Sequence, residues 1–195
     1  MDSKDNKVTL YTTQNPIVID TLEEKGVYHV KKEFIEMKYR EVSHIFLQCY
    51  DWFVSKAKNI VAKPEGAEYP IWTYIDAKYS GYFEDSYLLE LEVPIEDIIF
   101  FKMEDWNRIL NLRYLPKNSQ DGLKYDNKLK SYNIQDETEI FMNPYYPQLK
   151  SEVRKSWDNL FKHNEIVKSN RVFEGAIQGS LWEIKKSWLV DVKKG

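Results

Sequence analysis

Hydrophobic and polar residues alternate with a period of two in two segments of the chain. From Lys7 to Gln14, one set of residues alternates with another, Val8, Leu10, Thr12 and Gln14 with Lys7, Thr9, Tyr11 and Thr13. From Tyr87 to Val93, aliphatic residues share one face while Glu90 and Glu92 share the other. This period is typical of a half-buried antiparallel strand. It predicts strands over 7–14 and 87–93.

Shorter extended runs predict further strands. They are rich in the β-branched and aromatic residues that favour strands. The runs cover residues 27–30, 70–75, 98–101, 173–184 and 188–192. Because strands do not alternate regularly with helices along the chain, the order favours an antiparallel sheet over repeated βαβ units.

A spacing of three and four residues between apolar positions predicts the helices. Asn15 can cap a helix, Pro16 suits its first position and Gly26 can end it, which predicts a short helix over 16–25. Apolar stripes at the same spacing predict a long helix within 39–60, a short one over 105–111 and a last one over 148–163.

The stretch 117–133 is polar and contains Gly122, so we expect a long surface loop or a poorly ordered hairpin there. The other elements leave no linker long enough to divide the chain. They predict a single domain over residues 1–195, of the α+β class. Its sheet would be mainly antiparallel and could be split, with two longer helices packed on it.

Composition narrows the class of partners. The chain has 195 residues, 43% of them apolar and 30% charged, and its net charge is −3. These fractions of apolar and charged residues are typical of a globular protein. A small negative net charge produces no positive electrostatic potential that would attract a polyanion, so nucleic acid is not indicated as a partner. The apolar runs are far shorter than a membrane span and the charged start is unlike a signal peptide. We therefore expect a cytoplasmic protein without a membrane partner.

Standard cofactor and metal motifs are missing from the sequence. Its seven glycines form neither a dinucleotide fingerprint nor a P-loop, and its three histidines are far apart. One cysteine, Cys49, excludes an intrachain disulfide and a multi-thiolate metal cluster. Cys49 lies in the apolar stripe of the long helix, where an inert buried thiol is expected rather than a nucleophile. We expect no metal.

Three features could carry chemistry. Glu90 and Glu92 could act as paired carboxylates, but their alternation with aliphatic residues favours a solvated strand face. The aromatic run between Tyr69 and Tyr87 could line a pocket for a flat ligand, or fill a core or an interface. Gln178 and Glu183 place polar groups within a strand-like run, on opposite faces because they are five residues apart.

Four segments together resemble a known bacterial family. They are Tyr11-Thr12-Thr13-Gln14, the run from Tyr69 to Tyr74, the run from Leu89 to Asn111, and Ile177-Gln178-Gly179-Ser180-Leu181-Trp182. These segments are similar to the family catalogued as domain of unknown function 3841. The resemblance covers nearly the whole chain, and the family's name implies no activity.

The order of elements is also similar, more distantly, to the ADP-ribosyltransferase fold. In that fold a first strand, a middle strand with aromatic or hydroxyl residues and a late strand with a catalytic Glu surround bound NAD. The first-strand position would fall on Thr12, Thr13 or Gln14, the middle position on Trp72, Thr73 and Tyr74, and the late position on Gln178 or Glu183.

The resemblance implies a specific role for several of these residues. Trp72 and Tyr74 would clamp nicotinamide, Gln14 would contact ribose and Glu183 would stabilise the charge on ribose as nicotinamide leaves. The chain departs from the fold on its first strand, where it offers neither the usual His nor Arg. If Gln178 holds the late position, the missing negative charge predicts binding without efficient transfer.

Three functions follow as expectations. The first is an NAD-dependent, ADP-ribosyltransferase-like protein that modifies a protein or nucleic acid in bacterial conflict or signalling. The second is a non-catalytic module whose aromatic pocket binds a protein or nucleotide ligand. A component of a toxin–antitoxin or phage-defence system, active only with a partner chain, is a third reading.

Overall fold

A six-stranded antiparallel sheet forms the centre of the computed structural model, which describes residues 6–194 apart from the side chain of Lys38. The strand order is β5-β6-β3-β1-β4-β8, and β2 and β7 form a second, two-stranded sheet. The strands are β1 (Lys7–Gln14), β2 (Val27–Tyr28), β3 (Ile71–Tyr74), β4 (Tyr87–Pro94), β5 (Ile99–Lys102), β6 (Ile177–Leu181), β7 (Ile184–Lys185) and β8 (Leu189–Lys194). The α+β class and the antiparallel sheet agree with the sequence prediction.

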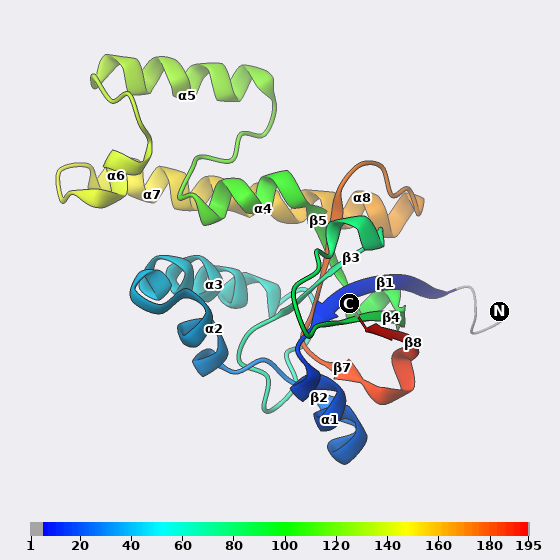
Figure 1. The fold of residues 1–195 in the computed structure, drawn as a ribbon. Coiled ribbons are helices and arrows are strands. Elements are labelled where there is room, and N and C mark those ends of the chain that lie inside the picture. Colours follow the sequence, from blue (N-terminus) through cyan, green and yellow to red (C-terminus); the bar gives the residue numbers. More distant parts are fainter. Residues whose placement is uncertain (1–5, 195) are drawn as a thin grey trace.

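Helices cover both faces of the sheet. α3, α4 and α7 contribute to the core on one face, and α1 and α8 contribute to the core on the other. Figure 1 shows α4 and α7 above the strands and α1 below them. The helices are α1 (Pro16–Lys25), α2 (Lys32–Tyr39), α3 (Ser43–Ala57), α4 (Met103–Leu110), α5 (Ser119–Ser131), α6 (Thr138–Met142), α7 (Pro147–Ser156) and α8 (Lys162–Asn170). Short 3₁₀ segments at 40–42 and 157–161 join α2 to α3 and α7 to α8. None of the helices within residues 6–194 has both the length and the apolarity needed to cross a bilayer.

The two faces of the sheet bury separate apolar cores. One core packs β3 and β5 against α3, α4, α5 and α7, around fully buried Phe53, Phe101 and Trp157. The other packs β1, β4 and β6 against α1 and α8, with Leu10 and Leu22 almost completely buried. Burial of apolar area on both faces is the main force that holds the helices to the sheet.

The first strand and helix follow the sequence pattern closely. β1 covers residues 7–14 as predicted and pairs with β4 along its whole length. The Asn15 side chain accepts a hydrogen bond from Ile17 N at 3.3 Å, and Gly26, with φ of 72°, donates its N–H to Leu22 O at 3.0 Å. A left-handed residue without Cβ is the expected end of such a helix.

The predicted loop at 117–133 is wrong, because this stretch contains α5. Asn118 caps α5 by accepting a hydrogen bond from Asp121 N at 2.9 Å. Tyr125 and Leu129, four residues apart, are buried in the first core, and the Tyr125 ring stacks on Tyr114 with 4.0 Å between ring centroids. Two buried residues on an otherwise polar helix give too narrow a stripe for the period to be seen in the sequence.

One predicted helix is divided, one is shorter and one strand is shorter. The helix expected within 39–60 corresponds to α3, and α2 precedes it, separated by a turn at Arg40 whose φ is 47°. The helix expected over 148–163 becomes α7, a 3₁₀ segment and α8, and it continues to Asn170. The strand expected over 173–184 is limited to β6, after which the chain leaves the sheet to form β7.

The sheet is nearly divided between β1 and β3. In the described chain these strands share one register position, Tyr11 opposite Tyr74, whereas β1 and β4 share eight. Because Tyr74 is the last residue of β3, the N-terminal half of β1 has no β3 residue opposite it. Space for a ligand is therefore expected beside the N-terminal half of β1.

Candidate functional site

A row of side chains crosses the sheet on a single face, because residues directly opposite each other in antiparallel strands point the same way. The row is Asp191 (β8), Glu90 (β4), Tyr11 (β1), Tyr74 (β3), Gln178 (β6) and Phe101 (β5). We call it the cross-strand row. It joins positions that lie up to 180 residues apart in the sequence, counting from Tyr11 to Asp191.

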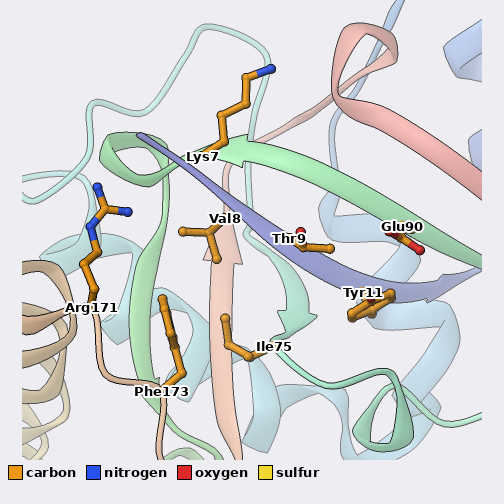
Figure 2. Close-up of a pocket in the computed structure, with 8 residues that line it drawn as sticks. All are labelled: Lys7, Val8, Thr9, Tyr11, Ile75, Glu90, Arg171 and Phe173. Carbon is orange, nitrogen blue, oxygen red and sulfur yellow. The ribbon is translucent and has the colours of Figure 1, made fainter. Parts of the chain in front are cut away.

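Half of this face is open. The side chains of Lys7, Thr9 and Glu92 on β1 and β4 are exposed, whereas Gln178 and Phe101 lie beneath the helices. A hollow of about 520 Å³, the β1 concavity, adjoins the open half. Its lining is apolar at Val8, Ile75 and Phe173, polar at Thr9 and Tyr11, and charged at Lys7, Glu90 and Arg171 (Figure 2).

The size and neighbourhood of the β1 concavity suit a small organic ligand. Ligand pockets commonly have volumes of about 300–1,000 Å³. A second hollow of about 370 Å³ shares Tyr11, Ile75 and Glu90 with the first. Tyr11 thus lies where the two hollows meet, directly opposite Tyr74 in the cross-strand row.

Charge is distributed unevenly in the β1 concavity. Figure 2 shows Lys7 and Arg171 toward one end and Tyr11 with Glu90 toward the other. The Lys7 ammonium lies 4.0 Å from the Glu92 carboxylate, and the Arg171 Nη2 donates to Asn6 Oδ1 at 2.8 Å. The end with Lys7 and Arg171 therefore favours an anionic group of a ligand, and the end with Tyr11 and Glu90 favours a hydrogen-bond donor of the ligand.

The covered half of the cross-strand row contains an unsatisfied polar atom. The Gln178 side chain is hydrogen-bonded to Tyr74 and is 4% exposed, but its Oε1 has no partner in the described structure. A buried amide oxygen without a donor is costly, because it loses its hydrogen bond to water. An N–H or O–H donor that reached Gln178 would recover that loss.

Aromatic residues surround Gln178 and Tyr74. The Trp72 Nε1 donates to the Tyr50 hydroxyl at 2.8 Å, and the Trp72 and Trp106 ring centroids are 4.8 Å apart. Burial raises the pKa of Tyr50 well above its usual value and also raises the pKa of Tyr74, although the hydrogen bond from Gln178 opposes the second shift. Both hydroxyls are therefore neutral at physiological pH and serve as hydrogen-bonding groups rather than as bases.

Three of the predicted site residues do not reach this face. The Thr12 hydroxyl donates to Trp72 O at 2.9 Å and accepts from the Gln14 Nε2 at 2.7 Å. The Thr73 hydroxyl donates to Gly179 O at 2.9 Å and is completely buried. Neighbouring residues in a strand point to opposite faces, so Thr12, Gln14 and Thr73 cannot join Tyr74. They hold the sheet together instead.

Glu183 also lies outside the cross-strand row. It follows the end of β6, and its carboxylate lies 3.1 Å from the His29 Nε2 and 3.1 Å from the Lys185 Nζ. The Glu183 and His29 side chains are only 17% and 19% exposed. The structure thus brings together Trp72, Tyr74 and Gln178 from the predicted set and separates Glu183 from them.

Other candidates for chemistry are structural. Cys49 is fully buried, its Sγ donates to Ile109 O at 3.2 Å, and burial raises its pKa to about 12. This agrees with the predicted inert thiol. Within residues 6–194, no group of three or more His, Cys, Asp or Glu side chains is arranged to hold a metal ion.

Sequence reasoning missed most residues of the β1 concavity. Glu90 and Glu92 look equivalent in the sequence, but Glu92 is exposed near Lys7 whereas Glu90 is half-buried in the concavity. Arg171 and Phe173 come from the loop after α8, although the sequence predicts a strand that begins at Phe173. The period of two places Tyr11 on the same strand face as Lys7 and Thr9, but its position opposite Glu90 depends on the pairing of two distant strands.

No curated protein and no solved structure matches this chain. One family model matches residues 9–190, a range that contains every position of the cross-strand row except Asp191. Since this match covers most of the sequence, the chain belongs to the family described as domain of unknown function (DUF3841).

Proposed function

We propose that the chain is an ADP-ribosyltransferase-like protein that binds NAD in the β1 concavity without transferring ADP-ribose efficiently. The single observation behind this proposal is the strand order. The first, middle and late strands that surround NAD in the ADP-ribosyltransferase fold correspond here to β1, β3 and β6, and these are consecutive in the sheet. Their side chains meet in the cross-strand row at Tyr11, Tyr74 and Gln178.

The residues present fit the parts of NAD. Tyr11 offers an aromatic face for a flat ring, and Lys7 and Arg171 offer positive charge for phosphates. Gln178 lies beneath the helices and lines neither hollow, so its Oε1 could accept a hydrogen bond from a carboxamide or an exocyclic amine only if the ligand extended past Tyr74. NAD itself supplies a glycosidic bond whose cleavage releases nicotinamide.

The absence of a suitably placed charge argues against efficient transfer. A carboxylate near the ribose would stabilise the positive charge that develops there as nicotinamide leaves. The late-strand member of the cross-strand row is the neutral Gln178, while Glu183 is held by His29 and Lys185 after the strand has ended. Binding is thus better supported than turnover.

Transfer of ADP-ribose to a protein or nucleic acid, in bacterial conflict or signalling, is the second candidate. Glu183 favours it, because the carboxylate is largely buried and comes two residues after β6. A shift of residues 182–183 would be required to bring it to the row. If the protein neither binds NAD nor releases nicotinamide from it, the remaining function is binding of a protein ligand on the open face of the sheet.

The test combines two measurements on purified protein. Thermal unfolding with and without NAD reports binding, because a ligand that binds only the folded state raises Tm. Release of nicotinamide, with a cell lysate as acceptor, reports chemistry. The variants are Gln178→Ala and Glu183→Gln; the second keeps the shape of the side chain and serves as the matched control.

The proposal predicts that NAD raises the Tm of the wild type and of Glu183→Gln, and raises it less for Gln178→Ala. No sample should release nicotinamide above the rate without protein. Release that is lost in Glu183→Gln would instead support the transferase. If NAD neither shifts Tm nor is cleaved, the nucleotide site is refuted and a protein ligand becomes the better account.

A further inference from the structure

Glu90 occupies a special position in the β1 concavity. It lines both hollows, is half-buried, and lies directly opposite Tyr11 in the β1–β4 ladder. Tyr11 also lines both hollows. A carboxylate and an aromatic ring therefore flank the space in which a ligand would lie.

The acidic neighbours of Glu90 are in ion pairs with lysines, whereas the Glu90 side chain is in none. Glu92 lies 4.0 Å from the Lys7 Nζ, and Asp191 lies 3.1 Å from the Lys193 Nζ. Lys193 also lines the second hollow with Glu90 and the two charges attract each other, but among residues 6–194 the Glu90 carboxylate forms no ion pair within 4.0 Å and no side-chain hydrogen bond. Its two oxygens remain available as acceptors for hydroxyl or amino donors.

The far end of the concavity has the opposite charge. Lys7 and Arg171 lie there, and Ile75 and Phe173 line the space between the two ends (Figure 2). A complementary ligand has an anionic group at one end, an apolar or aromatic portion, and donors that face Glu90. A nucleotide combines these features in a phosphate, a base and a ribose with two hydroxyl groups.

We infer that Glu90 accepts hydrogen bonds from the ribose hydroxyls of a bound nucleotide, whose phosphate is directed toward Lys7 and Arg171. This inference rests on the proposed function and names the part of the nucleotide that is recognised. A carboxylate that bonds a ribose in this way rejects a 2′-phosphate by charge repulsion. The site therefore selects NAD over NADP.

The test measures affinity by calorimetry for three probes: NAD, AMP and 2′,3′-dideoxy-AMP. The proteins are the wild type, Glu90→Gln and, as a matched control on the same strand face, Glu92→Gln. A hydrogen bond to a charged group is strong, so the wild type should bind AMP about 10- to 100-fold more tightly than dideoxy-AMP. Glu90→Gln should lose most of this ratio, and Glu92→Gln should keep it.

The outcomes separate this inference from the proposed function. If the wild type binds NAD but does not distinguish AMP from dideoxy-AMP, or if Glu90→Gln keeps the ratio, the inference is overturned and NAD binding stands. If the wild type binds none of the probes, the nucleotide site itself is refuted. The wild-type ratio requires no variant, so a folding defect in Glu90→Gln cannot obscure the result.

Discussion

The substitution Gln178→Leu should stabilise the free protein while it weakens nucleotide binding. Gln178 is 4% exposed, and none of residues 6–194 donates a hydrogen bond to its Oε1. An unsatisfied buried polar group costs about 1–3 kcal/mol, and leucine has a similar volume without that cost. The change also removes the hydrogen bond to Tyr74, which contributes about 0.5–1.5 kcal/mol. Because Tyr74 is only half-buried, water can replace that bond.

The net effect expected is a gain of about 1 kcal/mol in the free energy of unfolding. For a chain of this size that gain corresponds to a rise in Tm of about 2–4 °C. Urea unfolding followed by tryptophan fluorescence measures it, and an unchanged m-value shows that the two states are comparable. Gln178→Ala is the control, since it removes volume as well as polarity and should destabilise the protein by about 1–3 kcal/mol.

A loss of more than about 1 kcal/mol in Gln178→Leu would refute this reasoning. Such a loss would mean that the amide oxygen is satisfied in the free protein, for example by an ordered water molecule. The proposed role of Gln178 as an acceptor kept open for a ligand would then have no basis. A stable variant with unchanged affinity for NAD would also contradict that role, though not the energetic argument.

Three further predictions concern the sheet, the buried thiol and the late carboxylate. Gly179→Ala places a Cβ 2.8 Å from Thr73 Oγ1 and should cost about 1–3 kcal/mol in urea unfolding, whereas Gly122→Ala in α5 should add about 0.5–1 kcal/mol. Burial raises the pKa of Cys49 to about 12, so its contribution to stability is complete below the unfolded pKa of about 8.5 and is lost as pH rises toward 12. A coloured thiol reagent should accordingly react only as the protein unfolds. Glu183→Gln should lower stability by about 1 kcal/mol through the lost ion pair with Lys185 and the weakened contact with His29, but leave NAD affinity unchanged by calorimetry.

Local signals were sufficient for most of the elements. The strand at residues 7–14 and the helix at residues 16–25 were predicted with their ends, because period, cap and stop signals all lie within the segments. α5 was missed because only Tyr125 and Leu129 among its residues are buried, and the packing partners that bury them come from distant helices. Tertiary contacts decided its structure, which local polarity could not reveal.

The candidate site was only partly predictable for a different reason. Trp72, Tyr74 and Gln178 were selected from strand-like runs, and the register does place Tyr74 opposite Gln178. Whether a residue faces the open side of the sheet depends on the register between strands. That register is set by the pairing of distant segments and cannot be predicted from any one of them. Glu90 was therefore treated as equivalent to Glu92, and Thr73 was grouped with Tyr74 although they point to opposite faces.

The most direct test of nucleotide binding at the open face is a calorimetric titration of NAD into the wild type and into Tyr11→Ala. Stacking of a ring on an aromatic side chain contributes about 1–3 kcal/mol. The account predicts saturable binding to the wild type and affinity lower by about tenfold or more in Tyr11→Ala. Equal affinity in the two proteins would place NAD elsewhere, and no binding to the wild type would contradict the nucleotide site altogether.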